Sequence, residues 1–251
     1  MRFSLLSLFP EIVNFCTQQS ICGKALAKGL FELESIQIRD YAINEYGKVD
    51  DAVYGGGTGM LMMAEPIYQA AQEAKERFRK SHSAGKEKII YLSPRGRCLT
   101  QDLAKDLLNY DHLILLCGHY EGVDARVLEE LDADELSIGD YVLTGGELAA
   151  SVLIDVVARM IPGVLPNTEA WQEDSHASGF LECNHYTRPA NWRDHEVPSV
   201  YLSGHAEKIS RQRQAASLYE TLCRRAELIK EPIERSEAMD LAHYINQDQD
   251  M

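Results

Sequence analysis

The feature that limits the fold most is a set of three short apolar runs, at residues 3–9, 88–92 and 112–117. Nearly continuous apolar runs of this length are typical of strands buried on both faces. A helical pattern follows Thr100, a good N-cap residue, and lies between the last two runs. Residues 65–80 predict another helix from their Ala, Glu and Lys content, with a proline in the first turn. This alternation predicts an α/β domain, with a parallel sheet flanked by helices, over residues 1–162.

The chain changes character after this predicted domain. Pro166, Pro189 and Pro198 interrupt a mixed polar stretch in which no period is sustained. Beyond residue 204, apolar residues return at helical spacing, for example at Ala215 and Leu218. We therefore expect a flexible interdomain connector over residues 163–178 and a small all-helical C-terminal domain over residues 179–251.

Composition excludes several classes of protein. The chain is 45% hydrophobic and 25% charged, which is ordinary for a globular protein. No apolar run approaches the roughly 20 residues of a membrane span, so no membrane partner is expected. The N-terminal segment lacks a small-residue cleavage site and is interpreted as a buried strand, not a signal peptide. The 6 cysteines are widely spread without a C-x-x-C pair, which predicts reduced thiols in a cytoplasmic protein.

The charge distribution gives a mixed indication about nucleic acid. A net charge of −14 opposes general binding to a polyanion. Between residues 205 and 230, however, 6 basic residues stand against 3 acidic ones, a segment that could face phosphates or simply be a solvated helix. Upstream, Tyr186, Arg188, Trp192 and Arg193 combine aromatic rings with cations, a mixture on which single-stranded RNA bases stack.

Glycines gather in three clusters, at residues 54–60, 117–122 and 137–147. The last two follow predicted strand ends, where open α/β sheets bind ligands. Neither the dinucleotide fingerprint nor the phosphate-binding P-loop is present, and these two clusters contain no Lys or Arg to hold a phosphate chain. Turns would explain any one cluster, but three in one domain favour a pocket for a neutral heterocycle, such as the adenosine of S-adenosylmethionine.

A polar stripe crosses the apolar helix predicted after Gly146, where Ser151, Asp155 and Arg159 recur at every fourth residue. At this spacing an Asp155–Arg159 ion pair is the more frequent arrangement, although an arginine at a helix end can also meet a ligand. Asp174 stands in a Glu-Asp-Ser string that by itself indicates a solvated turn or helix cap. The histidines of this region are too widely spaced for a zinc site.

Taken together and in order, these strings resemble the bacterial tRNA (guanine-N1)-methyltransferase family. The shared motifs are YGGGTGM (54–60), YLSPRG (91–96), CGHYEG (117–122), SIGDYVLTGGE (137–147), VARMIPGVL (157–165), EDS (173–175) and HYTRP (185–189). The resemblance covers nearly the whole chain. It implies methyl transfer from S-adenosylmethionine to N1 of guanine 37, the tRNA base next to the anticodon.

The resemblance also implies a fold and a set of site residues. The family has the knotted SPOUT architecture, with a trefoil knot late in the α/β domain, a tRNA-binding C-terminal domain, and a homodimer with shared active sites. Asp174 matches its general base and Arg159 its charge-stabilising arginine. The implied cofactor-binding residues are Tyr91, Leu92, Pro94, Gly118, Tyr120, Glu121, Ile138, Gly139, Tyr141, Leu143, Gly145 and Gly146. The implied tRNA-binding residues are Gly55, Gly59, His185, Tyr186, Arg188, Arg211 and Arg213.

Mg²⁺ is associated with the family, and Glu121 is a candidate helper, but the resemblance identifies no metal ligands. The sequence departs from the family pattern at Val53, His119, Ala206 and Gln212, and the last two concern tRNA docking. Two alternatives remain open: a knotted RNA ribose 2′-O-methyltransferase, and a non-catalytic tRNA-binding module. Intact Arg159 and Asp174 disfavour the latter.

Overall fold

The computed structural model describes residues 1–82, 85–167 and 170–248. The chain divides into two compact units, Met1–Thr168 and Glu169–Met251. This division falls inside the connector predicted at residues 163–178. Residues 168 and 169 of that connector lie outside the described residues.

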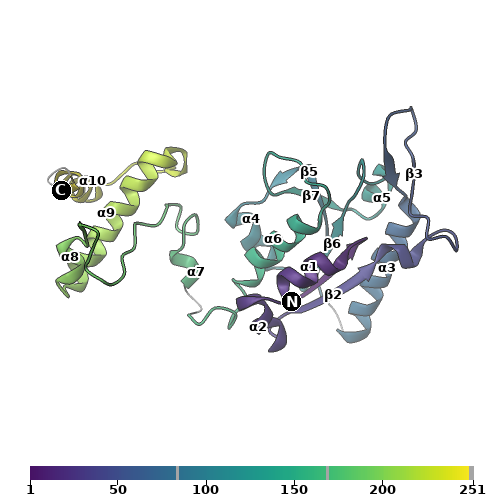
Figure 1. The fold of residues 1–251 in the computed structure, drawn as a ribbon, viewed down its shortest axis with the longest axis horizontal. Coiled ribbons are helices and arrows are strands. Elements are labelled where there is room, and N and C mark those ends of the chain that lie inside the picture. The colour runs from purple at the N-terminus through teal and green to yellow at the C-terminus, as the bar shows by residue number, and fades with distance from the viewer. Residues whose placement is uncertain (83–84, 168–169, 249–251) are drawn as a thin grey trace. The chain divides into compact units, whose positions relative to one another are not determined.

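The first unit is built on a five-stranded sheet in the order β2-β1-β6-β5-β7, and every strand pair is parallel (Figure 1). Two of its inner strands, β1 and β6, bury every residue, as their apolar runs predicted. The predicted α/β class is thereby confirmed. The strands are β1 (Arg2–Ser7), β2 (Glu32–Gln37), β5 (Glu87–Cys98), β6 (His112–Cys117) and β7 (Asp134–Ser137).

Helices cover both faces of this sheet. On one face, α3 and α5 share a buried core with Leu6, Ile114 and Leu116 of the sheet. On the other, α6 contacts β1 and β6 and packs against α1 and α4. These helices, with α2, are α1 (Pro10–Thr17), α2 (Ser20–Ala27), α3 (Ala64–Ser81), α4 (Gln101–Leu107), α5 (Ala125–Glu130) and α6 (Glu147–Ala158).

Both helices predicted by residue range are present. The Thr100 hydroxyl accepts a hydrogen bond from the Leu103 N–H at 3.2 Å and so caps α4, as expected. The helix expected over residues 65–80 is α3, which has Pro66 in its first turn. After the short 3₁₀ segment Ile38–Tyr41, a hairpin of β3 (Asp50–Ala52) and β4 (Met60–Met62) carries the first glycine cluster.

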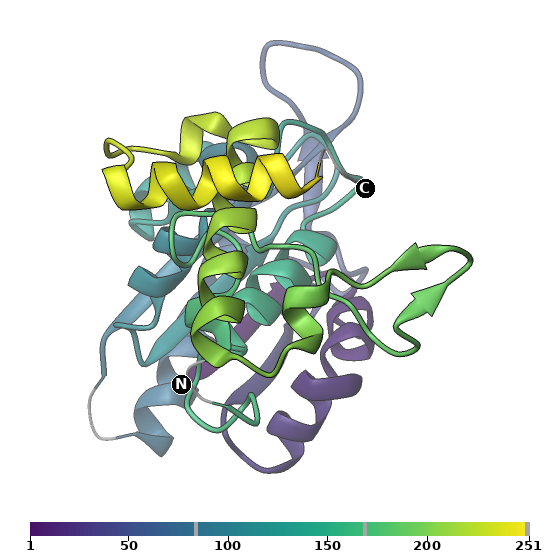
Figure 2. The ribbon, with the colours of Figure 1, turned by 90° about the vertical axis from the view of Figure 1, so that its left-hand side faces the viewer.

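The second unit differs from the all-helical expectation at one place. A short hairpin joins β8 (Asn191–Trp192) to β9 (His195–Glu196) and projects from the helices (Figure 2). Its turn residues, Arg193 and Asp194, both have positive φ, at 53° and 65°, as two-residue hairpin turns require. The other elements are α7 (Ala170–Glu173), α8 (Ser199–Leu202), α9 (Ala206–Arg224), the 3₁₀ turn Ala226–Leu228 and α10 (Arg235–Asp248).

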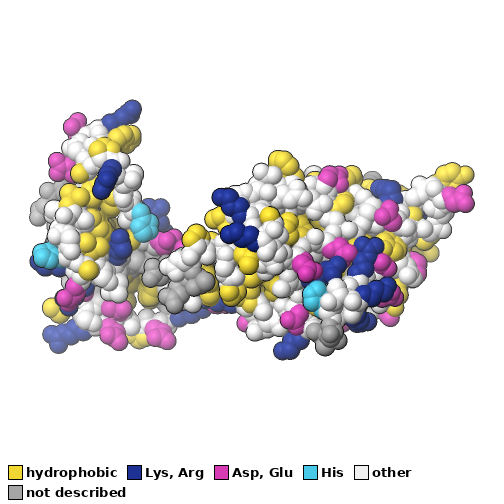
Figure 3. All heavy atoms as spheres, turned by 90° about the horizontal axis from the view of Figure 1, so that it is seen from below, with side chains coloured by type: hydrophobic (Ala, Val, Ile, Leu, Met, Phe, Trp, Pro, Cys, Tyr) yellow, Lys and Arg dark blue, Asp and Glu magenta, His cyan; other side chains and the backbone are white. Residues whose placement is uncertain are grey.

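Acidic and basic side chains are intermixed over the surface of the first unit (Figure 3). Arg77, for example, lies 2.6 Å from Glu73 and 3.0 Å from Glu34. Such pairs compensate individual charges locally and leave the net charge of −14 unchanged. Among the described residues, no helix combines the length and the apolar character that crossing a bilayer would require.

Candidate functional site

A pocket of about 430 Å³ lies in the first unit, at the carboxyl ends of β6 and β7 and beside residues 91–95 within β5. Open parallel sheets bind ligands at this edge. Every residue that the resemblance implied for cofactor binding lines this one pocket, although they come from three separate stretches of the chain: Tyr91, Leu92, Pro94, Gly118, Tyr120, Glu121, Ile138, Gly139, Tyr141, Leu143, Gly145 and Gly146.

Glycine at position 146 lets two of the glycine clusters meet. The Gly146 N–H donates a hydrogen bond to the Gly118 carbonyl at 3.0 Å, and His119 and Gly145 form an antiparallel bridge. A Cβ at 146 would lie only 2.7 Å from the Cα of Cys117, which real side chains do not tolerate. The clusters at 117–122 and 137–147 are therefore two walls of one site, and their glycines are needed for the close approach.

The loop at residues 118–122 is also held from the other side, by β4. The Glu121 N–H donates to the Met60 carbonyl, and the Met62 N–H donates to the Gly122 carbonyl, both at 3.0 Å. Within this loop Tyr120 has a φ of 58°, a conformation that costs energy for a residue other than glycine. A Cβ at Gly59 would clash with the Glu121 side chain, so the first glycine cluster packs directly against the pocket wall.

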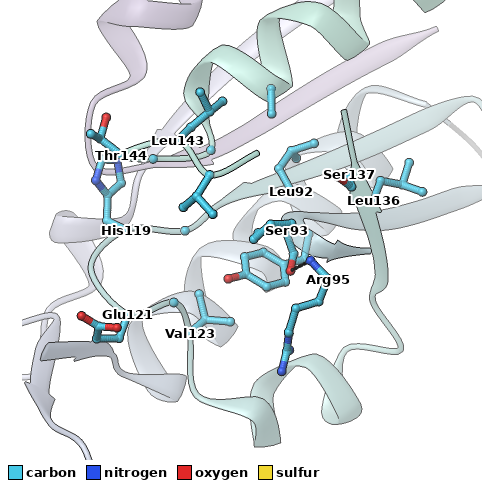
Figure 4. Close-up of a pocket in the computed structure, with 18 of the residues that line it drawn as sticks. Leu92, Ser93, Arg95, His119, Glu121, Val123, Leu136, Ser137, Leu143 and Thr144 are labelled. Carbon is cyan, nitrogen blue, oxygen red and sulfur yellow. Dashed lines mark hydrogen bonds between the residues drawn. The ribbon is translucent and has the colours of Figure 1, made fainter. Parts of the chain in front are cut away.

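Apolar side chains and backbone groups dominate the pocket lining. Leu136 and Ser137 stand on one side, and His119 and Glu121 on the other (Figure 4). The Arg95 guanidinium is engaged by Glu135, at 3.1 and 3.2 Å from its two oxygens. Burial, and then the charge of Glu135, raise the pKa of Tyr91, so its phenol stays protonated. Such a pocket suits a largely neutral ligand better than a phosphate chain.

Sequence reasoning missed one buried carboxylate beside the pocket. Glu147, the first residue of α6, is 2% exposed. It accepts hydrogen bonds from the Ser7 hydroxyl at 2.5 Å and lies 2.8 Å from His119 Nε2. This group ties the end of β1, the 118–122 loop and α6 together. The signal available in the sequence was an acidic residue directly after Gly-Gly and before an apolar helix.

The two residues expected to carry out the chemistry belong to different units. Arg159 is the C-cap of α6 in the first unit. The sequence spacing had suggested an ion pair between Arg159 and Asp155. The Asp155 carboxylate accepts a hydrogen bond from the Cys22 thiol at 3.1 Å. Asp174 directly follows α7 in the second unit, is half-buried, and accepts a backbone hydrogen bond from the Ala177 N–H at 3.1 Å.

The residues expected to bind tRNA divide into two groups. Gly55 and Gly59 lie in the β3–β4 hairpin of the first unit, both with positive φ. In the second unit, a single cavity of about 480 Å³ gathers His185, Tyr186, Arg188 and Arg213. Arg211 does not line that cavity and instead pairs with Glu207 at 3.1 Å.

The described part of the chain holds no group of three or more His, Cys, Asp or Glu side chains that could bind a metal ion. Glu121 is the one carboxylate among the residues that line the pocket at the sheet edge.

Comparison with known proteins identifies the family to which the chain belongs. Residues 1–231 match the family model described as tRNA (Guanine-1)-methyltransferase TrmD. A protein of Ruminiclostridium cellulolyticum is 48% identical over 231 residues, which cover 91% of this chain and 96% of the relative. One of Clostridioides difficile is 43% identical, with 94% and 100% covered. Both carry the name tRNA (guanine-N(1)-)-methyltransferase. The chain therefore belongs to the tRNA (guanine-1)-methyltransferase family, and it is an enzyme of that class.

Proposed function

We propose that the pocket of the first unit binds S-adenosylmethionine and that the chain transfers its methyl group to N1 of guanine 37 in tRNA. The fit rests on the lining: backbone amides at the glycines, apolar walls, and a volume of about 430 Å³. A Cβ at Gly118 would lie 2.9 Å from the Tyr91 ring, so the cradle depends on glycine there. When bound, the cofactor supplies an electrophilic methyl group on its sulfonium.

Asp174 is the proposed general base, because guanine N1 carries a proton that must leave as the nitrogen attacks. Negative charge then develops toward O6 of the guanine, where the guanidinium of Arg159 acts as a charged donor. The pocket holds both reactants in one orientation, which removes much of the entropic cost of a bimolecular reaction. This mechanism requires Asp174, in the second unit, to reach the pocket of a first unit. We propose that this first unit belongs to the other copy of the chain in a homodimer.

We also propose that the pocket region threads as the trefoil knot of the SPOUT class. The close crossing of residues 117–119 with residues 145–146 supports this topology. If Mg²⁺ takes part, Glu121 is the pocket carboxylate that would approach it, with water and the substrates completing the shell, since Mg²⁺ binds readily through one or two carboxylates. Six free cysteines fit a cytoplasmic location, where tRNA is modified.

The observation that carries the proposal is the convergence of the family's cofactor motifs on one pocket in a chain of this family. The test is a methyl-transfer assay with labelled S-adenosylmethionine on tRNA transcripts that carry guanine or adenine at position 37. Label should enter only the guanine transcript, and digestion with mass spectrometry should place it on the base. A methylated ribose would support the 2′-O-methyltransferase alternative, and no incorporation would leave a tRNA-binding module.

Replacing Arg159 with Gln should lower kcat by about 100- to 1000-fold, the usual effect of removing one transition-state donor. Arg159→Lys should recover part of this loss, because lysine keeps the charge but not the planar fork of donors. Steady-state kinetics on the guanine-37 transcript would measure both. Arg79→Gln is the matched control, because Arg79 is an exposed α3 residue paired with Glu87. Equal kcat values for the Arg159→Gln and Arg79→Gln variants would contradict the assigned role.

The homodimer is proposed from an apolar face of the first unit. Helices α1 and α6 pack against each other, yet they leave large side chains in solvent. Phe15 is 71% exposed, Leu148 51% and Val152 43%. Exposed apolar patches of this kind mark interaction sites. A second copy of the chain is the occupant we assign, because α6 leads directly from the pocket to Arg159, which the shared active site needs.

Introducing Asp at both Phe15 and Val152 should therefore separate the dimer. Each large apolar side chain contributes about 1.5–3 kcal/mol when buried, so association should weaken by at least about 100-fold. Analytical ultracentrifugation should show monomers, and methyl transfer should be lost with them. Tyr46→Asp is the control, because Tyr46 is 95% exposed in the loop before β3. A double variant that sediments and reacts like the native chain would refute this interface.

A further inference from the structure

The side chains of His119 and Glu147 meet directly behind one wall of the pocket in the first unit. His119 Nε2 lies 2.8 Å from each carboxylate oxygen of Glu147. The His119 side chain is 15% exposed and that of Glu147 is 2% exposed. His119 lines the pocket, whereas Glu147 does not. Any effect of Glu147 on a ligand must therefore pass through a neighbour such as His119.

Glycine at position 145 makes room for this pair. A Cβ at Gly145 would lie 2.4 Å from His119 Cε1 and 2.6 Å from Glu147 Oε2, closer than real side chains approach. The backbones of His119 and Gly145 also form an antiparallel bridge. The string Gly-Gly-Glu at residues 145–147 therefore brings the carboxylate to the imidazole across a backbone with no side chain in the way.

Burial makes the hydrogen-bond partners of Glu147 energetically important. A carboxylate removed from water costs free energy unless hydrogen bonds replace its hydration. The Ser7 hydroxyl donates to Oε1 at 2.5 Å, and His119 Nε2 reaches both oxygens. Glu147 is also the first residue of α6, where the helix dipole favours negative charge. The carboxylate is thus a fixed point, attached to β1 and α6, from which the imidazole is held.

The imidazole belongs to a loop that contains a strained residue. Tyr120, which follows His119 and lines the pocket, has a φ of 58°. A bulky residue keeps such a conformation when the surrounding structure enforces it. After Tyr120, the Glu121 N–H is bonded to the Met60 carbonyl at 3.0 Å. Before it, the attachment is the His119 side chain, which extends toward the segment that carries Thr144 (Figure 4).

We propose that His119 and Glu147 are a positioning pair, which holds Tyr120 and the loop 118–122 in the conformation that accepts S-adenosylmethionine. The inference rests on the proposed function, because it assumes that cofactor. It assigns a role to two residues outside the cofactor-binding set that the family resemblance implied. Without the pair, the loop populates other conformations, and the apparent affinity falls in proportion to the fraction of molecules that can bind. A saturating cofactor concentration selects the competent conformation again, so kcat should be preserved.

The test compares two amides at position 119 in the full chain. Glutamine places its amide nitrogen where Nε2 of the imidazole lies, whereas asparagine is one methylene shorter and does not reach Glu147. His119→Asn should raise the Kd for S-adenosylmethionine, measured by calorimetry, by roughly 10- to 100-fold, the value of one hydrogen bond to a charged group. His119→Gln should keep the native Kd. At saturating cofactor, both variants should methylate the guanine-37 transcript with the native kcat.

His82→Asn is the matched control, because His82 lies 3.9 Å from Glu32 in a more exposed pair of the same unit and does not line the pocket. It should keep the native Kd. Glu147→Gln tests whether His119 acts through the carboxylate. In the Glu147→Gln background, His119→Asn should raise the Kd less than in the native chain, because the hydrogen bond that it removes no longer involves a charge.

Hydrogen exchange gives a readout that does not depend on the cofactor. The amides of Glu121 and Gly122 are bonded to the carbonyls of Met60 and His119, both at 3.0 Å. In the His119→Asn variant these two amides should exchange faster than in the native chain, because the loop opens locally. The amides of α3 should keep their native rates. Equal loss of protection in the loop and in α3 would indicate general destabilisation and would contradict a local positioning role.

Two failures can be told apart. If the native chain does not bind S-adenosylmethionine, the proposed function falls and this inference falls with it. If the native chain binds it but His119→Asn matches His119→Gln and His82→Asn in Kd and in exchange, the positioning role alone is refuted. A His119→Asn variant with the native Kd and a lower kcat would refute it as well, because His119 would then act on the chemical step.

Discussion

Replacing Asp174 with Asn is expected to lower turnover by about 100- to 10 000-fold, the range for loss of a general base. The amide has nearly the same shape but cannot take the proton from guanine N1. Affinity for S-adenosylmethionine should not change, because Asp174 belongs to the second unit and does not line the pocket of the first. Single-turnover methyl transfer and calorimetric cofactor binding, on the same preparation, would measure the two quantities.

Asp194→Asn is the matched control for this substitution. Asp194 is an exposed carboxylate of the second unit, in the turn between β8 and β9. Asparagine tolerates its positive φ of 65° as well as aspartate does. The Asp194→Asn variant should therefore keep native turnover. If the Asp174→Asn variant turned over as fast, guanine N1 would have to lose its proton to another group, and the assignment of Asp174 would be wrong.

A large effect on stability is expected from His112, the first residue of β6. Its side chain is fully buried, donates or accepts a 2.8 Å hydrogen bond with the Ser4 hydroxyl, and stacks on Phe78 at 4.4 Å. Burial, followed by the positive charge of Arg2, lowers the pKa of His112 to about 3. His82 and Lys75 act in the same direction, while Glu87 Oε2 lies 3.8 Å from His112 Nδ1. The folded chain therefore keeps this ring neutral.

The sign of the pH dependence follows from this lowered pKa. Below about pH 6.5 the unfolded chain protonates the histidine but the folded chain does not, so the free energy of unfolding falls as the pH drops toward 3. The contribution lost by pH 4.5 is about 3 kcal/mol. Urea unfolding of the full chain between pH 7.5 and 4.5 would measure it.

A double variant isolates this contribution from that of the carboxylates. Ser4→Ala with His112→Phe removes both members of the buried hydrogen bond. Glu34 Oε2, which also accepts from the Ser4 hydroxyl at 3.5 Å, keeps its hydrogen bond from Arg2. The unfolding free energy of the double variant should fall less steeply with acid than that of the native chain, by about 3 kcal/mol over the same interval. His195→Asn, in the exposed hairpin strand β9, should retain the native slope. A double variant as acid-sensitive as the native chain would refute the role of His112.

Most of the short elements at the start of the second unit could not be predicted from local sequence patterns. Residues 163–203 show no sustained period in the sequence, and the structure places three short elements there, α7, the β8–β9 hairpin and α8. Elements of two to four residues leave no repeat to detect. The hairpin depends on two residues with positive φ, Arg193 and Asp194, and an arginine there carries no sequence signal for such a turn.

The two edge strands of the sheet were not predicted from the sequence, for a related reason. The strands β2 (ELESIQ) and β7 (DELS) lie at the two edges of the sheet and are mostly polar. An edge strand exposes part of its surface, so it needs no continuous apolar run. The inner strand β6 is buried at every position, and its run HLILLC identified it directly.

The sequence alone determined the class of the first unit, two of its helices and the two glycine clusters that meet at its pocket, while the individual lining residues were implied by the resemblance to the family. It could do so because strand burial, helix capping and the backbone freedom of glycine are local properties, written in neighbouring residues. Only the tertiary structure decided that Glu147 is a buried anchor and that Tyr186, Arg188 and Arg213 share one cavity. Those facts depend on which segments, distant in the sequence, come together in the fold. Contacts between distant segments produce no repeating pattern of residues that could be recognised in the sequence.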